Sequence, residues 1–234
     1  MIFSIILAGG KGLRMGSGIP KQFLLIREKP IIIHTLEKFL NFKDINKIYI
    51  GVPEDWIVYT KKMLNDFNID SGKIRIVGGG SERHLTLFNV MQDIYLRYGK
   101  KDHIVLTHDS VRPFITDRII EENINCSVKH GACSTAIKSV DTLAISNDGV
   151  TITDIPDRNI MYQIQTPQTF KFKELYELYK SLTENQKSRL TDACKIFDIK
   201  GRDIKIVRGE VFNIKITSQE DYKIALSIYE NLKK

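Results

Sequence analysis

The chain has 234 residues, of which 42% are hydrophobic and 27% charged, and its formal net charge is +7. These proportions are typical of a soluble globular domain that can bury a core without disulfides or structural metal, and the three scattered cysteines form no Cys-x-x-Cys pair. No signal peptide or long apolar stretch is visible, and the lysines and arginines form no basic tail. We therefore expect a cytoplasmic protein that binds no membrane and no nucleic acid and acts on phosphorylated metabolites.

The predicted elements alternate between buried strands and amphipathic helices. Short apolar runs indicate strands, and apolar residues three or four apart indicate helices. In chain order they are strand 4–8, helix 30–40, strand 47–52, helix 54–67, strand 73–77, helix 82–98, strand 103–108, helix 116–128 with Thr116 as its cap, and strand 132–136. This order predicts an α/β fold: a Rossmann-like, mostly parallel sheet with helices on both faces, in a single domain.

The region from residue 141 to 165 breaks this alternation. Asn147, Asp148 and Gly149 form a hairpin-turn signal between two β-rich stretches, so we expect a protruding β-hairpin arm at about 140–165. Such an arm either packs on a partner subunit or is a plain surface hairpin, and the pattern leaves both open. After it we expect helices at 173–182 and 192–198, strands at 204–207 and 212–216, and a last helix at 218–232 that Ser218 caps.

The glycine-rich loop after the first strand is the most informative stretch. It reads Leu-Ala-Gly-Gly-Lys-Gly-Leu-Arg-Met-Gly at 7–16, and glycines let backbone N–H groups approach phosphate oxygens. A P-loop does not fit, because Gly12 follows Lys11 where serine or threonine is required. A dinucleotide loop does not fit either, because Met15 takes the place of the third glycine and no acidic residue ends the second strand.

Positive charge distinguishes this loop from those two. Lys11 and Arg14 lie inside it and Lys21 follows shortly after, so a bound triphosphate would meet backbone donors and fixed cations together. Phosphoryl chemistry needs this combination, because negative charge is redistributed on the reacting phosphate in the transition state. The alternative is a glycine-rich turn with solvated cations.

Further motifs follow along the whole chain. Together they resemble the sugar-phosphate nucleotidyltransferases, and more narrowly the cytidylyltransferases that act on methylerythritol 4-phosphate or ribitol 5-phosphate. The motifs are Leu-Ala-Gly-Gly-x-Gly-x-Arg-Met at 7–15, Pro-Lys-Gln-Phe at 20–23, Gly-Gly-Ser-Glu-Arg at 79–83, Thr-His-Asp-Ser-Val-Arg-Pro at 107–113, Thr-Pro-Gln at 166–168, Thr-Asp-Ala at 191–193 and Asn-Ile-Lys at 213–215. The resemblance implies a nucleotide-diphospho-sugar transferase type of fold, CTP and a polyol or sugar phosphate as substrates, Mg²⁺ or another divalent cation as cofactor, and a homodimer joined through the arm.

The resemblance also implies roles for the matching residues. The nucleotide would contact Leu7, Ala8, Gly9, Gly10, Lys11, Gly12, Gly80, Ser81, Glu82, Arg83, Thr86, Ser110 and Arg112. The reacting phosphates would be stabilised by Arg14, Lys21 and Lys215, and the metal would be held by Asp109. The acceptor would contact Thr142, Arg158, Thr166, Thr191 and Asp192, with the arginine reaching it from the partner subunit's arm.

Physical arguments support three of these roles. Asp109 falls at the C-terminal end of a predicted strand, where ligands bind in α/β sheets, although a helix cap or an ion pair would also explain it. Arg158 can grip a phosphate with two parallel hydrogen bonds, or it is a solvated loop residue. Lys215 lies in an apolar predicted strand, where an unpaired ammonium would be unfavourable. Either it has an anionic partner, or its side chain extends so that the ammonium reaches solvent. His84 and His108 are predicted to be structural, because an anionic acceptor phosphate needs no general base.

The motifs also bear on the choice of acceptor. In the methylerythritol branch the strand motif usually reads His-Asp-Ala-Ala-Arg-Pro, whereas this chain has Ser110 and Val111 in place of the two alanines. This motif and the Thr-Asp-Ala-Cys-Lys-Ile-Phe stretch at 191–197 resemble the ribitol branch, which supplies CDP-ribitol for teichoic acids and related polymers. We therefore predict transfer of CMP from CTP to D-ribitol 5-phosphate with release of pyrophosphate. The alternatives are 2-C-methyl-D-erythritol 4-phosphate as acceptor, in isoprenoid synthesis, and a non-catalytic nucleotide-binding protein.

Overall fold

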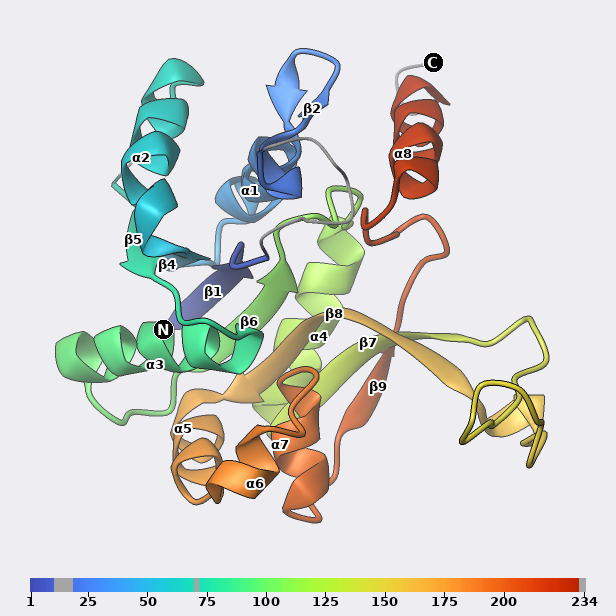
Figure 1. Ribbon diagram of the computed structural model, residues 1–234. Helices are drawn as coiled ribbons and strands as arrows, with labels where there is room; N and C mark the ends of the chain where they lie inside the picture. The colour runs from blue at the N-terminus through green and yellow to red at the C-terminus, as the bar shows by residue number, and fades with distance from the viewer. Residues whose placement is uncertain (11–18, 70–71, 232–234) are drawn as a thin grey trace.

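A computed structural model describes residues 1–10, 19–69 and 72–231, and its centre is a seven-stranded sheet of order β5-β4-β1-β6-β8-β7-β9 (Figure 1). Strand β8 is antiparallel to β6 and β7, and every other pairing in the sheet is parallel. This confirms the predicted α/β fold. The strands are β1 (Ile2–Leu7), β4 (Lys47–Val52), β5 (Ile74–Gly78), β6 (Ile104–Asp109), β7 (Ala132–Lys138), β8 (Tyr162–Lys171) and β9 (Lys205–Arg208).

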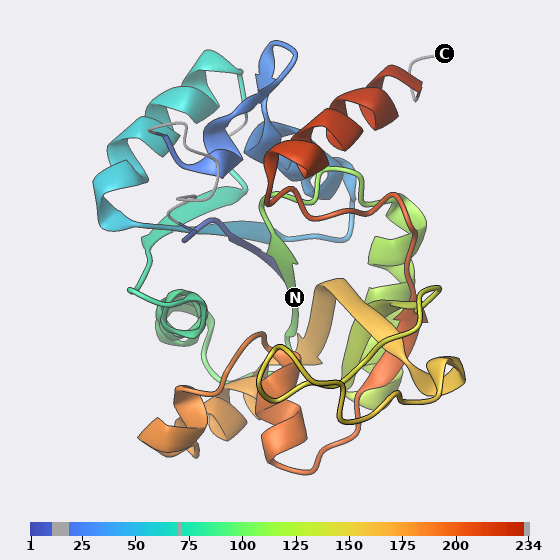
Figure 2. The same ribbon diagram turned by 45° about the vertical axis from the view of Figure 1, so that its right-hand side comes forward.

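Helices cover both faces of the sheet, as predicted (Figures 1 and 2). Helices α3 (Arg83–Tyr98), α5 (Phe172–Lys180) and α7 (Cys194–Ile199) pack on one face, and the short α6 (Glu184–Lys187) connects the last two. Helices α1 (Ile31–Asn41), α2 (Ile57–Asp66) and α4 (Asp117–His130) pack on the other. Strand β1 serves both layers, because alternate side chains point to opposite faces: Phe3 and Ile5 join the first core and Ile6 the second. None of the described helices is long and apolar enough to cross a membrane.

A third, smaller core lies at the end of the sheet where the candidate site is. It joins helix α8 (Gln219–Asn231) to the two-stranded hairpin of β2 (Leu25–Ile26) and β3 (Lys29–Pro30), which follows the 3-10 helix η2 (Lys21–Phe23). Its buried members are Ile26, Ile31, Val111, Phe114, Ile216 and Ala225. The segments that carry Lys21, Asp109 and Lys215 are therefore packed against one shared apolar cluster.

The predicted helix caps are confirmed. Thr116 Oγ1 accepts a hydrogen bond from Ile119 N at 3.4 Å, and Ser218 Oγ accepts one from Asp221 N at 3.1 Å. The prediction of a strand at 212–216 is wrong, since this described segment joins no sheet. Ile216 N instead donates to Val111 O at 3.0 Å, and its side chain enters the third core. The apolar pattern there reflects packing against the β6–α4 connection.

The predicted arm protrudes from the body of the protein (Figure 1), but it is not a regular β-hairpin. Between β7 and β8 the described residues make one isolated bridge, Ile145 with Asp154, and a 3-10 helix η4 (Arg158–Ile160). The predicted turn is present: Asp148 Oδ1 accepts from Val150 N at 2.9 Å, and Gly149 has a φ of 74°. A lone hairpin that packs against no other layer has little to stabilise a longer strand ladder.

Candidate functional site

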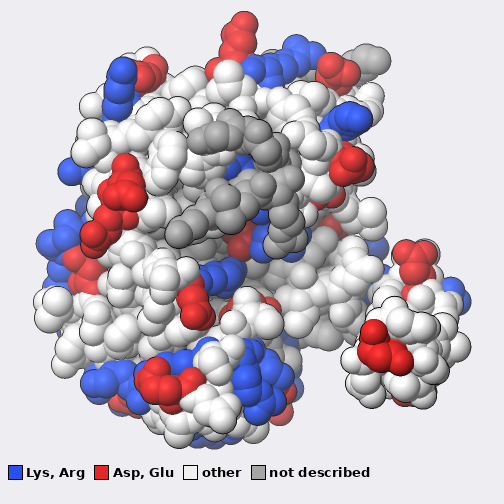
Figure 3. Space-filling view, viewed as in Figure 1, with Lys and Arg blue, Asp and Glu red and all other residues white. Residues whose placement is uncertain are grey.

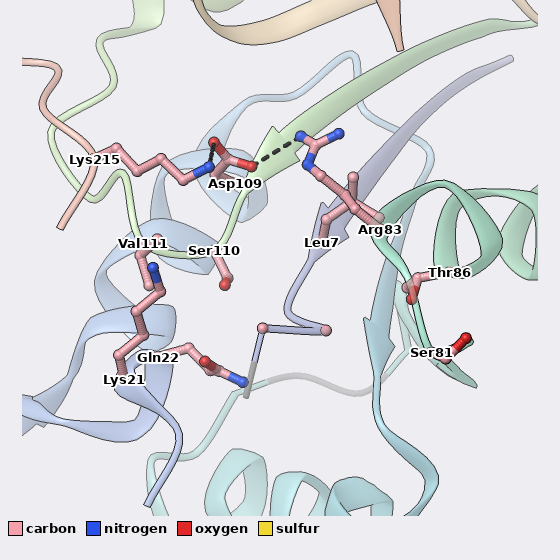
Figure 4. A pocket seen from close by; sticks show the side chains of 12 residues that line it. Leu7, Lys21, Gln22, Ser81, Arg83, Thr86, Asp109, Ser110, Val111 and Lys215 are labelled. Carbon is pink, nitrogen blue, oxygen red and sulfur yellow. Dashed lines mark hydrogen bonds and ion pairs between the residues drawn. The ribbon is translucent and has the colours of Figure 1, made fainter. Parts of the chain in front are cut away.

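The carboxyl ends of β1 and β6 border a cavity of about 260 Å³. Strand β1 is the point where the strand order reverses, because the chain runs outward through β4 and β5 and then returns to β6 on the other side. Open α/β sheets bind ligands at such switch points. The lining residues come from separate segments (Figure 4): Leu7, Gly9, Gly10, Lys21, Gln22, Ser81, Arg83, Thr86, Asp109, Ser110, Val111 and Lys215.

Asp109 lies at the centre of a charge cluster in this cavity. Its Oδ1 accepts from Arg83 Nη2 at 2.8 Å, and its Oδ2 is 3.1 Å from Lys215 Nζ and 3.4 Å from Arg112 Nε. Burial alone would raise the pKa of the Asp109 carboxyl, but the charges of Arg83, Lys215 and Arg112 outweigh burial and hold that pKa well below its usual range. The carboxylate therefore stays ionised, and the surplus of cations around it leaves the cavity suited to a polyphosphate.

A buried hydrogen-bond chain supports Asp109 from behind. Arg112 O can only accept, so His108 Nε2 donates to it at 3.0 Å, and Nδ1 of the neutral ring accepts from Thr166 Oγ1 at 3.0 Å. Thr166 Oγ1 in turn accepts from Asp109 N at 3.1 Å. Burial lowers the pKa of His108 to about 4, so the ring is neutral at neutral pH. His108 thus has the structural environment expected from the sequence. The hydroxyl of Thr166, predicted to contact the acceptor, is used inside the protein.

Glycines close around Thr86 at the wall of the cavity. Thr86 Oγ1 accepts from Gly80 N at 3.1 Å and donates to Glu82 O at 3.2 Å. A Cβ at Gly51 would lie 2.5 Å from Thr86 Cγ2, and a Cβ at Gly79 would lie 2.8 Å from Thr86 Oγ1. The predicted nucleotide contact Thr86 therefore also shapes the loop at 79–82, because only glycines leave room for its side chain.

We expect Gly51→Ala to destabilise the protein by about 1–3 kcal/mol, because the new methyl group overlaps Thr86 Cγ2. Thr86→Ser removes that methyl group and keeps the hydroxyl, so the double variant should recover most of the lost stability. Urea unfolding of each variant measures this, with Thr86→Ser alone as the control. A double variant no more stable than Gly51→Ala would contradict this account of the wall.

The structure brings together most of the predicted site residues that it describes. Ten line the cavity: Leu7, Gly9, Gly10, Lys21, Ser81, Arg83, Thr86, Asp109, Ser110 and Lys215. Ala8, Gly80 and Glu82 lie directly beside them in the chain, and Arg112 contacts Asp109. Lys11, Gly12 and Arg14 lie outside the described residues.

The predicted acceptor residues are not gathered at this cavity. Thr142 and Arg158 are exposed on the arm, where Arg158 Nη1 donates to Val140 O at 3.0 Å. Thr191 is exposed, and Asp192 Oδ2 accepts from Gln168 Nε2 at 2.6 Å. Asp192 Oδ1 also accepts from Lys195 N at 3.0 Å, in the first turn of α7. Within one chain, these residues line no part of the cavity that holds Asp109.

Two lining residues, Gln22 and Val111, were not among the predicted site residues. Gln22 Nε2 donates to Ala8 O at 2.7 Å, so this buried amide ties the 3-10 helix η2 to the end of β1. The position of Gln22 directly after Lys21 was a signal, but the sequence does not say which of the two side chains turns inward. Val111 belongs to the Asp109 motif, but the sequence pattern of an apolar residue there predicts a place in the core rather than in the site.

On the described part of the face shown in Figure 3, Lys and Arg side chains are interspersed with Asp and Glu. The described residues of this face therefore form no continuous basic patch or stripe of the kind that nucleic-acid-binding surfaces carry. At the cavity, by contrast, Arg83, Arg112 and Lys215 gather around Asp109, and Lys21 lines the same space.

Comparisons with known proteins agree with this geometry. A family model described as IspD, 2-C-methyl-D-erythritol 4-phosphate cytidylyltransferase, matches residues 2–231. The chain is similar to the 4-diphosphocytidyl-2C-methyl-D-erythritol synthase of Anaerococcus prevotii DSM 20548, with 32% identity and a TM-score of 0.82 over 98% of this chain and 96% of that chain. The fold is also that of the 2-C-methyl-D-erythritol 4-phosphate cytidylyltransferase of Francisella tularensis, with 23% identity and a TM-score of 0.79 over 96% of this chain and 97% of that chain.

Proposed function

Since the chain belongs to the IspD family, whose members are CTP-dependent cytidylyltransferases, we propose that it transfers CMP from CTP to D-ribitol 5-phosphate. The nucleotidyltransferase activity is that of the family, and the acceptor is our proposal. The observation that supports nucleotidyl transfer is the cavity at the ends of β1 and β6, where glycines and cations from separate segments surround Asp109.

The proposed reaction is an in-line displacement at the α-phosphorus of CTP. A phosphate oxygen of the acceptor forms a bond to that phosphorus, and the bond to the oxygen that bridges to the β-phosphate breaks. Pyrophosphate leaves with the electron pair of that bond, and because the attacking oxygen is already anionic, no side chain has to remove a proton. We assign Lys21 and Lys215, which line the cavity, together with Arg14, to the stabilisation of charge on the reacting phosphates.

We propose that Asp109 holds Mg²⁺ or another divalent cation. The described residues contain no group of three or more His, Cys, Asp or Glu side chains that could hold a metal, so Asp109 is one ligand of a set that they do not complete. A carboxylate completed by triphosphate oxygens and water is the kind of ligand set that Mg²⁺ prefers. The residues therefore fit a cation that arrives with the nucleotide, and such a cation would neutralise charge on the leaving pyrophosphate.

Ser110 supports ribitol 5-phosphate as the acceptor. It lines the cavity beside Asp109, and its side chain points into the open space between Lys21 and Arg83 (Figure 4). A hydroxyl at this place can bond to a polyol hydroxyl, whereas the alanine usual in the methylerythritol branch cannot. Both acceptors carry hydroxyls, but ribitol 5-phosphate has one more, and a site that hydrogen-bonds this further hydroxyl discriminates against the acceptor that lacks it.

The second candidate acceptor is 2-C-methyl-D-erythritol 4-phosphate. The matching family model and the similar solved structures carry that substrate in their descriptions, so the comparisons favour it over ribitol 5-phosphate. What favours ribitol is confined to the motifs around Asp109 and Asp192.

Pyrophosphate release from CTP and Mg²⁺, measured with each acceptor in turn, tests the proposal. We expect kcat/KM to be at least about 10-fold higher with ribitol 5-phosphate than with methylerythritol 4-phosphate. The variant that carries both Ser110→Ala and Val111→Ala should shift this preference toward methylerythritol 4-phosphate. Activity with methylerythritol 4-phosphate alone would assign the second candidate, and no release with either acceptor would contradict transfer to polyol phosphates altogether.

We further propose that the chain acts as a homodimer joined through the arm, and that its product donates ribitol phosphate to teichoic acids or related polymers. The arm exposes apolar side chains that a partner would cover, among them Val150, Val140 and Ile160, with 89%, 75% and 73% of their surface accessible. Arg158 lies on the same arm, which supports the expectation that it serves the acceptor site of a neighbouring subunit.

A further inference from the structure

The backbone around Lys215 is tied to the turn that follows Asp109. On one side, Arg112 Nη1 donates to Asn213 O at 2.7 Å. On the other, Ile216 N donates to Val111 O at 3.0 Å. Lys215 lies between these two anchors, and its ammonium is 3.1 Å from Asp109 Oδ2. The distance between these two charged groups therefore depends on where residues 213–216 lie.

Asn213 is the buried residue that sets this position. It is 0% exposed, and its Nδ2 donates to Thr166 O at 3.0 Å and to Gln165 Oε1 at 3.1 Å. The orientation of both amides is determined by backbone carbonyls, which can only accept. Gln165 Nε2 must face Glu210 O, at 2.8 Å, and its Oε1 then faces the asparagine, which must present its own amide nitrogen.

One atom of the Asn213 side chain is buried without a hydrogen bond in the described part of the chain. Asn213 Oδ1 is buried and has no hydrogen-bond partner among the described residues. An unpaired buried acceptor is unfavourable, so the two bonds from Nδ2 and the position that they define are what this side chain contributes. Gln165 belongs to β8 at the root of the arm, so the pair joins three segments that are far apart in sequence.

We propose that Asn213 is a positioning residue, which together with Gln165 holds Lys215 against Asp109 and so sets the rate of CMP transfer. The inference rests on the role given to Lys215 in the proposed function. Asn213 itself does not line the cavity, so its effect reaches the reacting phosphates through Lys215.

Asn213→Asp tests this directly, because a carboxylate keeps the shape of the amide but cannot donate to Thr166 O or Gln165 Oε1. We expect kcat for pyrophosphate release to fall about 10- to 100-fold, while KM for CTP changes less than about 3-fold. In a Lys215→Ala background the same substitution should have little further effect on kcat. An equal fall in both backgrounds would overturn the proposal.

Asn123→Asp is the matched control. Asn123 is also 0% exposed, and its Nδ2 donates to Ile119 O at 2.8 Å and to Thr135 Oγ1 at 2.9 Å, away from the cavity. This control should lose stability and keep its kcat. If Asn213→Asp does the same, its role is only structural and the proposal is wrong.

A crystal structure of Asn213→Asp gives a readout that does not depend on activity. We expect the contact between Lys215 Nζ and Asp109, 3.1 Å in the native chain, to be lost, and an unchanged contact would overturn the proposal. Failure of the proposed function would show instead as no pyrophosphate release by the native protein. If Asn213→Asp does not fold, Asn213→Ser, which keeps one donor, carries the same measurements with a smaller expected effect.

Discussion

Asp109→Asn is expected to lower kcat for CMP transfer by about 10³-fold. The carboxylate is the negative partner of Arg83, Lys215 and Arg112, and it is the group assigned to the divalent cation. Asparagine keeps the shape but leaves these cations without their anion. Pyrophosphate release at saturating CTP and Mg²⁺ measures the effect. Thermal unfolding separates it from a loss of stability, which we expect to be about 3 kcal/mol because Arg112 is itself buried.

For the binding of CTP without metal, we expect Asp109→Asn to be a gain rather than a loss. Without metal, the Asp109 carboxylate repels the triphosphate, so Asp109→Asn should bind metal-free CTP more tightly than the native protein. Its CTP affinity should also depend less on Mg²⁺. Calorimetric titration with EDTA and with Mg²⁺ checks both, and an unchanged Mg²⁺ dependence would sink the role of Asp109 as a metal ligand.

Asp93→Asn provides the control for losing a paired carboxylate. Asp93 accepts from Arg75 at 2.6 Å and from Arg97 at 2.9 Å on helix α3, and it does not line the cavity. It should alter stability without altering turnover or the metal dependence of CTP binding.

Lys21→Ala is expected to lower kcat by about 10²- to 10³-fold while the Kd for CTP rises less than about 10-fold. The side chain runs beside Gly10, with its Cε 3.9 Å from the position of a Cβ there, and it faces the cavity from the wall opposite Arg83 (Figure 4). An ammonium at this place is of most use when charge shifts on the α-phosphate during displacement. Single-turnover rates and CTP titration separate the two effects, and an equal loss in turnover and binding would contradict a transition-state role.

Two further variants sharpen this test. Lys21→Arg keeps the charge but changes its shape, so it should restore part of the rate. Lys29→Ala removes a nearby lysine on β3 whose Nζ is paired with Glu37 at 2.7 Å outside the cavity, and it should leave turnover unchanged. We expect Arg14→Ala to behave like Lys21→Ala.

Local pattern was enough to predict the architecture and the centre of the site. Buried parallel strands are short apolar runs, and helices repeat their apolar residues every three or four positions, so the order of elements follows from the sequence. Asp109 and the glycines at 9–10 could be placed together because Asp109 ends one strand and the glycines follow another, and ligands gather at the carboxyl ends of strands next to a switch point.

Tertiary structure alone decided how that site is held. Arg112 contacts Asn213 and Asp109 contacts Thr166, and neither pair is close in sequence or marked by any periodicity. The segment at 212–216 looks like a strand by composition, but its backbone bonds and apolar side chains are taken up by the β6–α4 connection and the third core. The sequence by itself therefore determined the fold and the place of Gly9, Gly10 and Asp109 at the carboxyl ends of two neighbouring strands. Which cation pairs with Asp109, and which buried amide positions Lys215, was decided by packing between distant segments, because hydrogen bonds and ion pairs form with whatever group the fold brings within reach.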